Sequence, residues 1–265
     1  MKHIVNLLAF LLLLLVSSCK KKDNSPPSTV LLSKIVDNTP GDPANGQPIL
    51  SISYNGKQIS QVLRYNYNNG STTPGTETHI FIYKSNLFAG TTILNNNYPF
   101  GIDTTATVAT YVGNNLSAIQ DANYQTNFVY PNGAIDINGN YINGSFDDNY
   151  TQDEKHNYSS ENYSINGSKS NVSTLQFDNQ KNIVETLPLW QYFYAEQSLL
   201  TSEQGFGGII FNVLPNANNT VYWGPSPVTT FSYVYGSNGY PSSVVVNFNG
   251  GQDHETYSFQ YITVQ

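Results

Sequence analysis

The densest group of side chains that could do chemistry lies in the stretch DDNYTQDEKH, residues 147–156. Two carboxylates on opposite sides of a glycosidic bond can hydrolyse it, one as the acid and the other as the base or nucleophile. A catalytic pair normally projects from strands or rigid loops into a cleft, whereas neighbouring acids in a polar run are typical of a solvated loop. We therefore favour a loop here, and also at Asp253, His254 and Glu255.

The three histidines beyond the first 20 residues, His79, His156 and His254, form no HExxH, HxH or Cys-His spacing. The pattern therefore predicts structural or solvated histidines rather than metal ligands. No Gly-x-Ser-x-Gly, phosphate-loop or dinucleotide motif is present either. The sequence thus favours a non-enzymatic protein without a cofactor or metal.

A partial calcium-loop pattern runs from Asp136 to Asp147, with Asn138 and Asn140 at the third and fifth positions. The sixth position is Tyr141, where that loop needs glycine for its sharp turn. Tandem Asn-Gly turns account for the segment better.

Aromatic residues offer a different chemistry, because the flat faces of Tyr and Trp can stack on sugar rings. Trp190, Trp223 and Tyr240 are the candidate ligand-binding residues on this basis. The aromatic rows of the C-terminal part have another explanation, since alternating rings also form the buried face of a sheet.

The N-terminus carries the most specific signal. Lys2 precedes an apolar run from Ile4 to Val16, and Ser17, Ser18 and Cys19 follow. This order resembles a bacterial lipoprotein signal peptide. The resemblance implies cleavage before Cys19, a diacylglycerol on its thiol and a further acyl chain such as palmitate on its amino group. Two or more acyl chains hold a protein stably on a bilayer, so we expect an outer-membrane protein anchored by lipid, with the side it faces left open.

These features divide the chain into a signal peptide (1–18), a lipidated cysteine with a flexible tether (19–29) and a β-rich domain (30–265). A further division near 150–160 stays open. The tether sequence DNSPPST favours an extended conformation. Cys19 is the only cysteine, so the domain can form no disulfide. Beyond residue 22 the chain has seven Lys plus Arg against 18 Asp plus Glu, a formal balance of −11 that argues against nucleic-acid binding.

The domain composition predicts an all-β fold, either a meander or hairpin sheet or a sandwich. It has 20 Tyr, only 11% charged residues and many Asn-Gly pairs, which suit the tight turns of antiparallel hairpins. The pairs expected to form turns are Asn55-Gly56, Asn132-Gly133, Asn138-Gly139, Asn143-Gly144, Asn166-Gly167, Asn238-Gly239 and Asn249-Gly250.

Period-two patterns locate the expected strands. The clearest is a three-stranded meander over 231–235, 244–248 and 257–261. Paired strands are expected at 49–54 with 58–67 and at 158–165 with 172–177, and single strands at 79–83 and 105–112. The one helix expected is 188–200, with Pro188 in the first helical position.

The segments YSINGSKSNVSTLQFDNQKNIVETLPLW (163–190) and FSYVYGSNGYPSSVVVNFNGGQDHETYSFQY (231–261) resemble uncharacterised Bacteroidota-type lipoproteins built of tyrosine-rich hairpins, distantly similar to YD repeats. The shared motifs, at 178–182 and 237–241, are turn sequences, so the resemblance implies no catalytic residue in this chain. The tripeptide Asp103-Thr104-Thr105 resembles an O-glycan acceptor of such exported proteins.

The sequence therefore predicts a lipid-anchored binding module for an envelope protein or an extracellular glycan. Two alternatives remain. One is a glycan-degrading hydrolase with dispersed carboxylates, and the other is a periplasmic carrier of an apolar ligand.

Overall fold

The computed structural model describes residues 28–67, 74–97, 101–131, 134–141, 144–169, 173–200, 214–224, 228–248, 251 and 253–265. Cys19 lies outside the described residues, and so do the turns expected at 132–133 and 249–250. The described strands are β1 (Thr29–Asp37), β2 (Pro48–Asn55), β3 (Gln58–Asn66), β4 (Gly75–Lys84), β5 (Leu87–Asn97), β6 (Gly101–Val112), β7 (Asn115–Gln120), β8 (Tyr124–Val129), β9 (Ala134–Tyr141), β10 (Gly144–Gln152), β11 (Tyr158–Ile165), β12 (Ser168–Lys169), β13 (Ser173–Phe177), β14 (Thr220–Gly224), β15 (Thr229–Tyr235), β16 (Pro241–Phe248) and β17 (Asp253–Val264).

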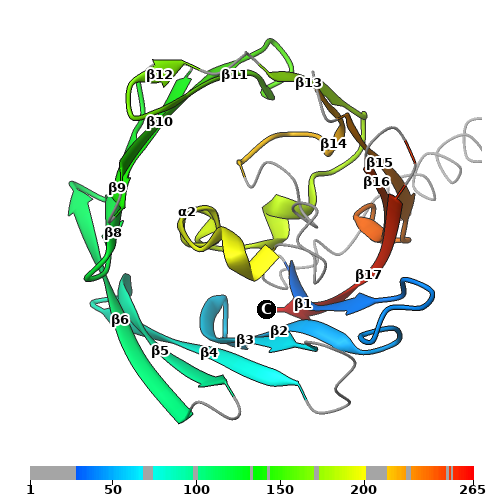
Figure 1. Ribbon diagram of the computed structural model, residues 1–265, viewed down its shortest axis with the longest axis horizontal. Coiled ribbons are helices and arrows are strands. Elements are labelled where there is room, and N and C mark those ends of the chain that lie inside the picture. The colour runs from blue at the N-terminus through cyan, green and yellow to red at the C-terminus, as the bar shows by residue number, and fades with distance from the viewer. Residues whose placement is uncertain are drawn as a thin grey trace, which may run out of the picture.

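These strands form one antiparallel sheet that closes on itself, because β1 pairs with both β2 and β17 (Figure 1). A closed ring with only antiparallel pairs needs an even number of strand positions. The 17 described strands meet this condition because β12 and β13 both pair with β11 and share one position. The chain is therefore all-β, as expected, and its sheet is an up-and-down barrel.

The inner face of the barrel holds the hydrophobic core. Successive side chains of a strand point to opposite faces, and in β16 the inward residues Val244, Val246 and Phe248 are buried while Ser243 and Asn247 lie on the other face. The expected C-terminal meander is confirmed as β15, β16 and β17, and its aromatic rows face the core. Burying such side chains contributes roughly 1.5–3 kcal/mol each.

The outer face is mainly polar. Across β8, β9 and β10, Asn127, Asn138 and Asp147 lie in register on this face, and the Nδ2 of Asn127 donates to the Oδ1 of Asn138 at 3.0 Å. Apolar side chains on the outer face include Ile80, Ile82 and Val108, on β4 and β6. These are interspersed with threonines such as Thr78 and Thr92.

The plug segment, residues 183–200, lies inside the barrel (Figure 1). It contains η2 (Ile183–Thr186), α2 (Trp190–Ala195) and η3 (Gln197–Leu200). Tyr192, Phe193 and Tyr194 of α2 are buried against the inner face of the sheet. Among the described residues, no helix is both long enough and apolar enough to cross a bilayer.

The expected helix at 188–200 exists, but its predicted bounds were wrong. Pro188 is not the first helical residue, because Leu189 adopts a left-handed conformation (φ 63°, ψ 47°) as N-cap and the helix begins at Trp190. It ends at Ala195 and a 3₁₀ turn follows. The expected strands at 49–54, 79–83 and 105–112 fall within β2, β4 and β6, and 158–165 is β11. The strand expected at 58–67 is β3, which ends one residue earlier.

The Asn-Gly pairs have different outcomes. Those at 55–56, 166–167 and 238–239 lie in turns between paired strands, each with glycine at positive φ. The turn predicted at Asn138-Gly139 was wrong, because both residues lie within β9. Gly139 is buried there, and a Cβ would overlap the Phe146 ring and the Gln125 carbonyl. Close packing therefore explains this glycine.

Candidate functional site

One end of the barrel, which we call the plug rim, is formed by alternate strand connections. Because antiparallel strands reverse direction at each step, the connections β2–β3, β4–β5, β6–β7, β8–β9, β10–β11, β13–β14 and β15–β16 all lie at this end. The connection from β13 to β14 is the longest of these and carries the plug segment into the barrel. β1 also begins at the plug rim, where Thr29 pairs with Val264.

The first cavity has a volume of about 610 Å³ and lies where three rim turns meet the plug segment. The turns come from β2–β3, β4–β5 and β6–β7. The cavity is lined by Lys57, Gln58, Tyr83, Asn86, Leu87, Phe88, Tyr111, Asn114, Asn115, Leu116, Tyr130, Pro188, Leu189 and Gln191. Lys57 is the only charged residue among these, and most of the others carry aromatic rings, aliphatic groups or side-chain amides.

Hydrogen bonds fix the tyrosine rings of the first cavity. The hydroxyl of Tyr111 donates to the carbonyl of Phe88 at 3.0 Å, and that of Tyr130 donates to the carbonyl of Leu116 at 3.3 Å. The Tyr130 hydroxyl also accepts from Nε2 of Gln191 at 3.0 Å. Burial raises the pKa of Tyr83 to about 12, so its hydroxyl stays protonated at neutral pH.

The rim turns are also held to one another. Ser85 and Asn86 both have positive φ, of 50° and 65°, which suits a two-residue hairpin turn. Nε2 of Gln58, in the neighbouring hairpin, donates to the carbonyl of Asn86 at 3.2 Å. The wall of the first cavity is therefore largely formed before any ligand arrives.

The second cavity has a volume of about 340 Å³. It is lined by His156, Val184, Glu185, Leu187, Pro188, Leu189, Trp190, Pro215, Asn216 and Ala217. Asn216 is only 1% exposed, and its Oδ1 accepts from the backbone N–H of Tyr158 at 2.7 Å. Its Nδ2 donates to no acceptor among the residues that the structure describes.

The two cavities share part of their wall. Pro188 and Leu189 line both of them, so the two cavities lie on either side of the turn that leads into α2. A left-handed backbone at a residue other than glycine costs roughly 1–2 kcal/mol, and Leu189 adopts this conformation at the shared wall.

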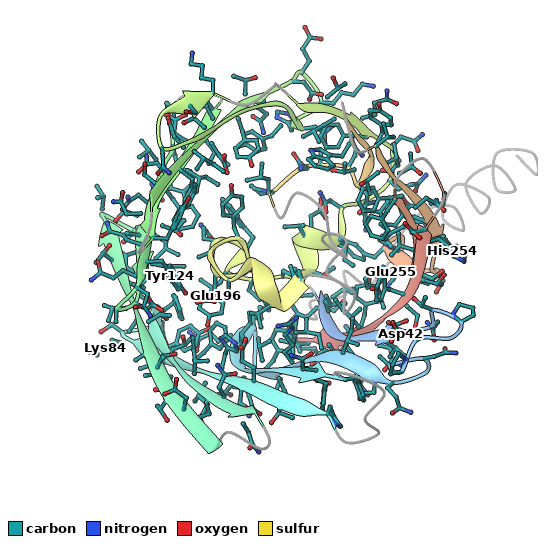
Figure 2. The ribbon with its side chains drawn as sticks, viewed as in Figure 1. Asp42, Lys84, Tyr124, Glu196, His254 and Glu255 are labelled. Atoms are coloured by element: carbon teal, nitrogen blue, oxygen red, sulfur yellow. The ribbon has the colours of Figure 1, made fainter. Side chains whose placement is uncertain are left out.

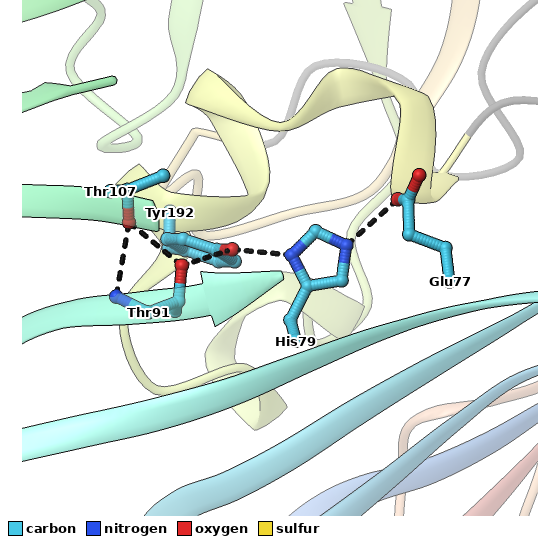
Figure 3. Close-up of polar contacts among 5 residues, drawn as sticks. All are labelled: Glu77, His79, Thr91, Thr107 and Tyr192. Atoms are coloured by element: carbon cyan, nitrogen blue, oxygen red, sulfur yellow. Dashed lines mark hydrogen bonds and ion pairs between the residues drawn. The ribbon is translucent and has the colours of Figure 1, made fainter. Parts of the chain in front are cut away.

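A chain of buried polar groups connects α2 to β4, β5 and β6 (Figure 3). His79 lies 2.7 Å from Oε1 of Glu77 through Nε2 and 2.5 Å from the Tyr192 hydroxyl through Nδ1. The Tyr192 hydroxyl lies 3.0 Å from Oγ1 of Thr91, which lies 2.7 Å from Oγ1 of Thr107. The hydrogen bond from His79 holds the pKa of Glu77 below its usual value.

This chain is structural rather than catalytic. His79 is 1% exposed and Tyr192 is completely buried, so a substrate could not reach the pair. The arrangement satisfies polar groups that would otherwise be costly to bury, and it fixes α2 against the sheet.

The acidic stretch at 147–156 does not form a catalytic pair. Asp147 and Asp148 lie on opposite faces of β10; Asp148 points inward and accepts a hydrogen bond from the Tyr194 hydroxyl. Burial raises the pKa of Asp148 to about 6. The loop expected here was wrong for 147–152, which belong to β10, and for 253–255, which belong to β17. Only at Asp153 is it confirmed, where the carboxylate accepts hydrogen bonds from the backbone N–H groups of Lys155 and Asn157 within a turn.

A partly buried acid, Glu196, lies at the end of α2, inside the barrel (Figure 2). Its burial, together with the nearby carboxylates of Glu77 and Asp121, raises the pKa of its carboxyl to about 8. The described residues contain no group of three or more His, Cys, Asp or Glu side chains placed to hold a metal ion. Asn138 and Asn140 of the partial calcium pattern lie within β9 rather than in a loop.

The predicted ligand-binding residues lie in three different places. Trp190 lines the second cavity and packs edge-on against Phe128 at 5.8 Å between ring centroids. Trp223 lies in β14 opposite Leu175. Tyr240 lies in the turn between β15 and β16, where its hydroxyl donates to Glu185 at 3.2 Å. Thr104 is exposed on β6.

The sequence did not reveal the tyrosines of the first cavity. Tyr83, Tyr111 and Tyr130 belong to ordinary alternating or turn segments. The one available signal was their position near strand ends beside Asn-rich turns. Only the closed sheet shows that these ends meet at one rim.

Comparison with known proteins gives limited information. No family model matches the chain, and no curated protein matches it. The solved structures that are similar to it include two described as porin-like proteins. The one from Bacteroides uniformis ATCC 8492 is 14% identical, covers 87% of this chain and 98% of its own, and gives a TM-score of 0.42. The one from Bacteroides vulgatus ATCC 8482 is 14% identical, with coverages of 88% and 99% and a TM-score of 0.40.

Proposed function

We propose that this protein is a non-enzymatic binding protein of the cell envelope, held on the outer membrane by a lipid at Cys19, whose first cavity binds a glycan. The observation that carries the proposal is the first cavity itself. It is open at the plug rim and lined by fixed tyrosine rings together with side-chain amides.

This lining suits the chemistry of sugars. A pyranose ring has an apolar C–H face, which packs on aromatic rings, and hydroxyls at its edge, which exchange hydrogen bonds with amides. Gln58, Asn114 and Gln191 supply such amides around Tyr83 and Tyr111. A volume of 610 Å³ lies within the range of about 300–1,000 Å³ for small-molecule sites.

The surface of the barrel supports a position outside the bilayer. A barrel that spans a membrane has an apolar outer band about 25 Å tall and a polar interior. Here the interior holds an apolar core around the plug segment, and the described outer face carries polar residues such as Asn127, Asn138 and Asp147 as well as exposed apolar ones such as Ile80, Ile82 and Val108. A lipid anchor provides membrane attachment without requiring the barrel to insert.

The described chain begins at the end of the barrel that carries the first cavity. β1 starts at the plug rim with Thr29, which is ten positions after Cys19 in the sequence. A fully extended chain of that length spans at most about 35 Å. The tether therefore keeps the plug rim within reach of glycans near the membrane surface.

The two alternatives fit less well. A hydrolase would need two carboxyl groups facing each other across a cleft, and the described residues that line the first cavity include none. The rings and aliphatic groups of this wall would also suit an apolar ligand, but such a ligand would not use Lys57 and the side-chain amides.

The test uses the mature chain from residue 19 with a Cys19→Ser substitution, which keeps every described residue. A glycan array would identify ligands, and calorimetry would then give the Kd. Tyr111→Ala is expected to weaken binding at least about tenfold, equivalent to about 1.4 kcal/mol. Tyr111→Phe keeps the ring and should stay within a few-fold of wild type.

Two further variants separate a lost site from a damaged fold. Asn114→Ala changes an exposed amide of the first cavity, so it should weaken binding without lowering the Tm. Tyr240→Ala changes an aromatic residue outside the first cavity and should leave binding intact. Absence of binding to any sugar, or binding that depends on Tyr240 and not on Tyr111, would contradict the proposal. Capture of an envelope protein alone would favour the partner role instead.

A further inference from the structure

The second cavity extends the first one along the plug rim. Both are bounded by Pro188 and Leu189, so a ligand that leaves one cavity over this turn enters the other. His156, in the connection from β10 to β11, shows that the second cavity also lies at the plug rim.

The second cavity has its own means of holding a sugar. The indole of Trp190 lies in its wall, beside the exposed carboxylate of Glu185 and the exposed imidazole of His156. Packing against Phe128 restricts the Trp190 ring. An aromatic wall beside hydrogen-bonding groups at its edge is the same combination as in the first cavity.

The backbone between the cavities is strained at one residue. Leu189 is held with φ 63° and ψ 47°, and no side chain caps the helix that follows. Such strain persists only where the surrounding structure enforces it, and it is concentrated at ligand-binding and switch positions. This strained residue lies between the cavities, because Pro188 and Leu189 line both of them whereas Trp190 lines only the second.

We propose that the two cavities are successive subsites for one linear oligosaccharide, which crosses the Pro188–Leu189 turn and stacks a sugar ring on Trp190. This inference rests on the proposed function, because it takes the first cavity as the primary glycan site. It narrows the ligand from any sugar to a chain long enough to occupy both cavities. A monosaccharide occupies the first cavity alone.

The test compares oligosaccharides of increasing length, from one to six units, built from the sugar that binds best on the array. With the wild-type chain, affinity should rise about tenfold or more once the ligand reaches the second cavity, and then level off. Trp190→Ala should remove this increase and leave the affinity for the shortest ligands within about twofold. Tyr111→Ala should weaken ligands of every length.

Two variants control for damage to the fold. Glu185→Ala changes an exposed residue of the second cavity, so it should reduce the gain from length without changing the Tm. Trp223→Ala removes the other tryptophan, which lies in neither cavity lining, and should preserve the full dependence on length.

The outcomes distinguish the two proposals. If affinity depends on Tyr111 but not on ligand length, the oligosaccharide inference is wrong while the glycan function stands. The inference is also wrong if Trp190→Ala and Glu185→Ala leave the gain from length intact. If no ligand of any length binds, the proposed function itself fails.

Discussion

The inner and outer faces of the barrel differ sharply in the described residues. The inner face carries aliphatic and aromatic groups around Phe193 and buried polar groups, of which His79 and Tyr192 bond to each other. The outer face carries polar side chains such as Asn127 and Asn138 as well as exposed apolar ones such as Ile82. Because the plug fills part of the barrel, this sheet supports a packed core. Closure of the strands alone therefore does not define a pore, and the chemistry of each face must be considered.

The largest expected effect comes from removing a core ring. Phe193 is completely buried in α2, and Phe193→Ala should lower the free energy of unfolding by about 3–5 kcal/mol through lost burial and the resulting cavity. Denaturant unfolding followed by circular dichroism would measure this. A loss below about 1 kcal/mol would mean that the plug segment contributes little to the core.

A smaller loss is expected from Tyr192→Phe. The substitution keeps the ring but removes the hydroxyl that bonds to Nδ1 of His79 and Oγ1 of Thr91. These buried groups then lack a partner, at a cost of about 1–3 kcal/mol. The double variant Tyr192→Phe with His79→Leu tests the reason, because it removes both sides of the hydrogen bond. A double variant no more stable than the sum of the two single losses predicts would argue against coupling through this bond.

A pH-dependent effect is expected from Glu196. Burial, with the nearby carboxylates, raises the pKa of its carboxyl from the ordinary value of about 4.5 to about 8 in the folded protein. Between these values the folded state retains a proton that the unfolded chain releases, so the free energy of unfolding falls as pH rises from about 4.5 to about 8. Glu196→Gln should flatten this decline and give a Tm a few degrees above wild type at pH 8.5.

Asp148 provides an internal comparison for this measurement. Burial raises its pKa only from the ordinary value of about 3.8 to about 6. Its effect on the free energy of unfolding therefore has the same sign but is complete near pH 6 to 7. Thermal unfolding at pH 5, 6.5 and 8.5 therefore separates the two acids. If Glu196→Gln leaves the change between pH 6.5 and 8.5 unaltered, Glu196 is not the group responsible.

The sequence predicted much of the sheet but not how it closes. Alternation along 231–261 correctly identified β15, β16 and β17, because each strand places its large residues on one buried face. The pairing of β1 with β17 joins residues more than 200 positions apart, and no local pattern contains that information. Gly139 shows a related limit, since the tertiary contact with Phe146 determines its role.

The candidate site was less predictable than the fold. Trp190 was selected because tryptophan can stack on sugars, and it does line a cavity. Tyr83 and Tyr111 were not selected, because in the sequence they look like other strand tyrosines. Their common position arises from antiparallel alternation, which brings the ends of β4 and β6 to the same rim.

The smallest effect is expected on the outer face. Ile82 is 44% exposed and lies near Val108, across Gly90. In water, Ile82→Thr should change the free energy of unfolding by less than about 0.5 kcal/mol, because an exposed side chain on a sheet loses little burial and threonine keeps the β-branch. In a barrel inserted in lipid, the same hydroxyl would face hydrocarbon and lower the free energy of unfolding clearly.

The two environments are distinguished by measuring the unfolding of the non-acylated chain twice, once in buffer and once in the presence of phospholipid vesicles. Equal stability of wild type and Ile82→Thr under both conditions would support a barrel that stands outside the bilayer, whereas a loss seen only with vesicles would show that this face contacts lipid.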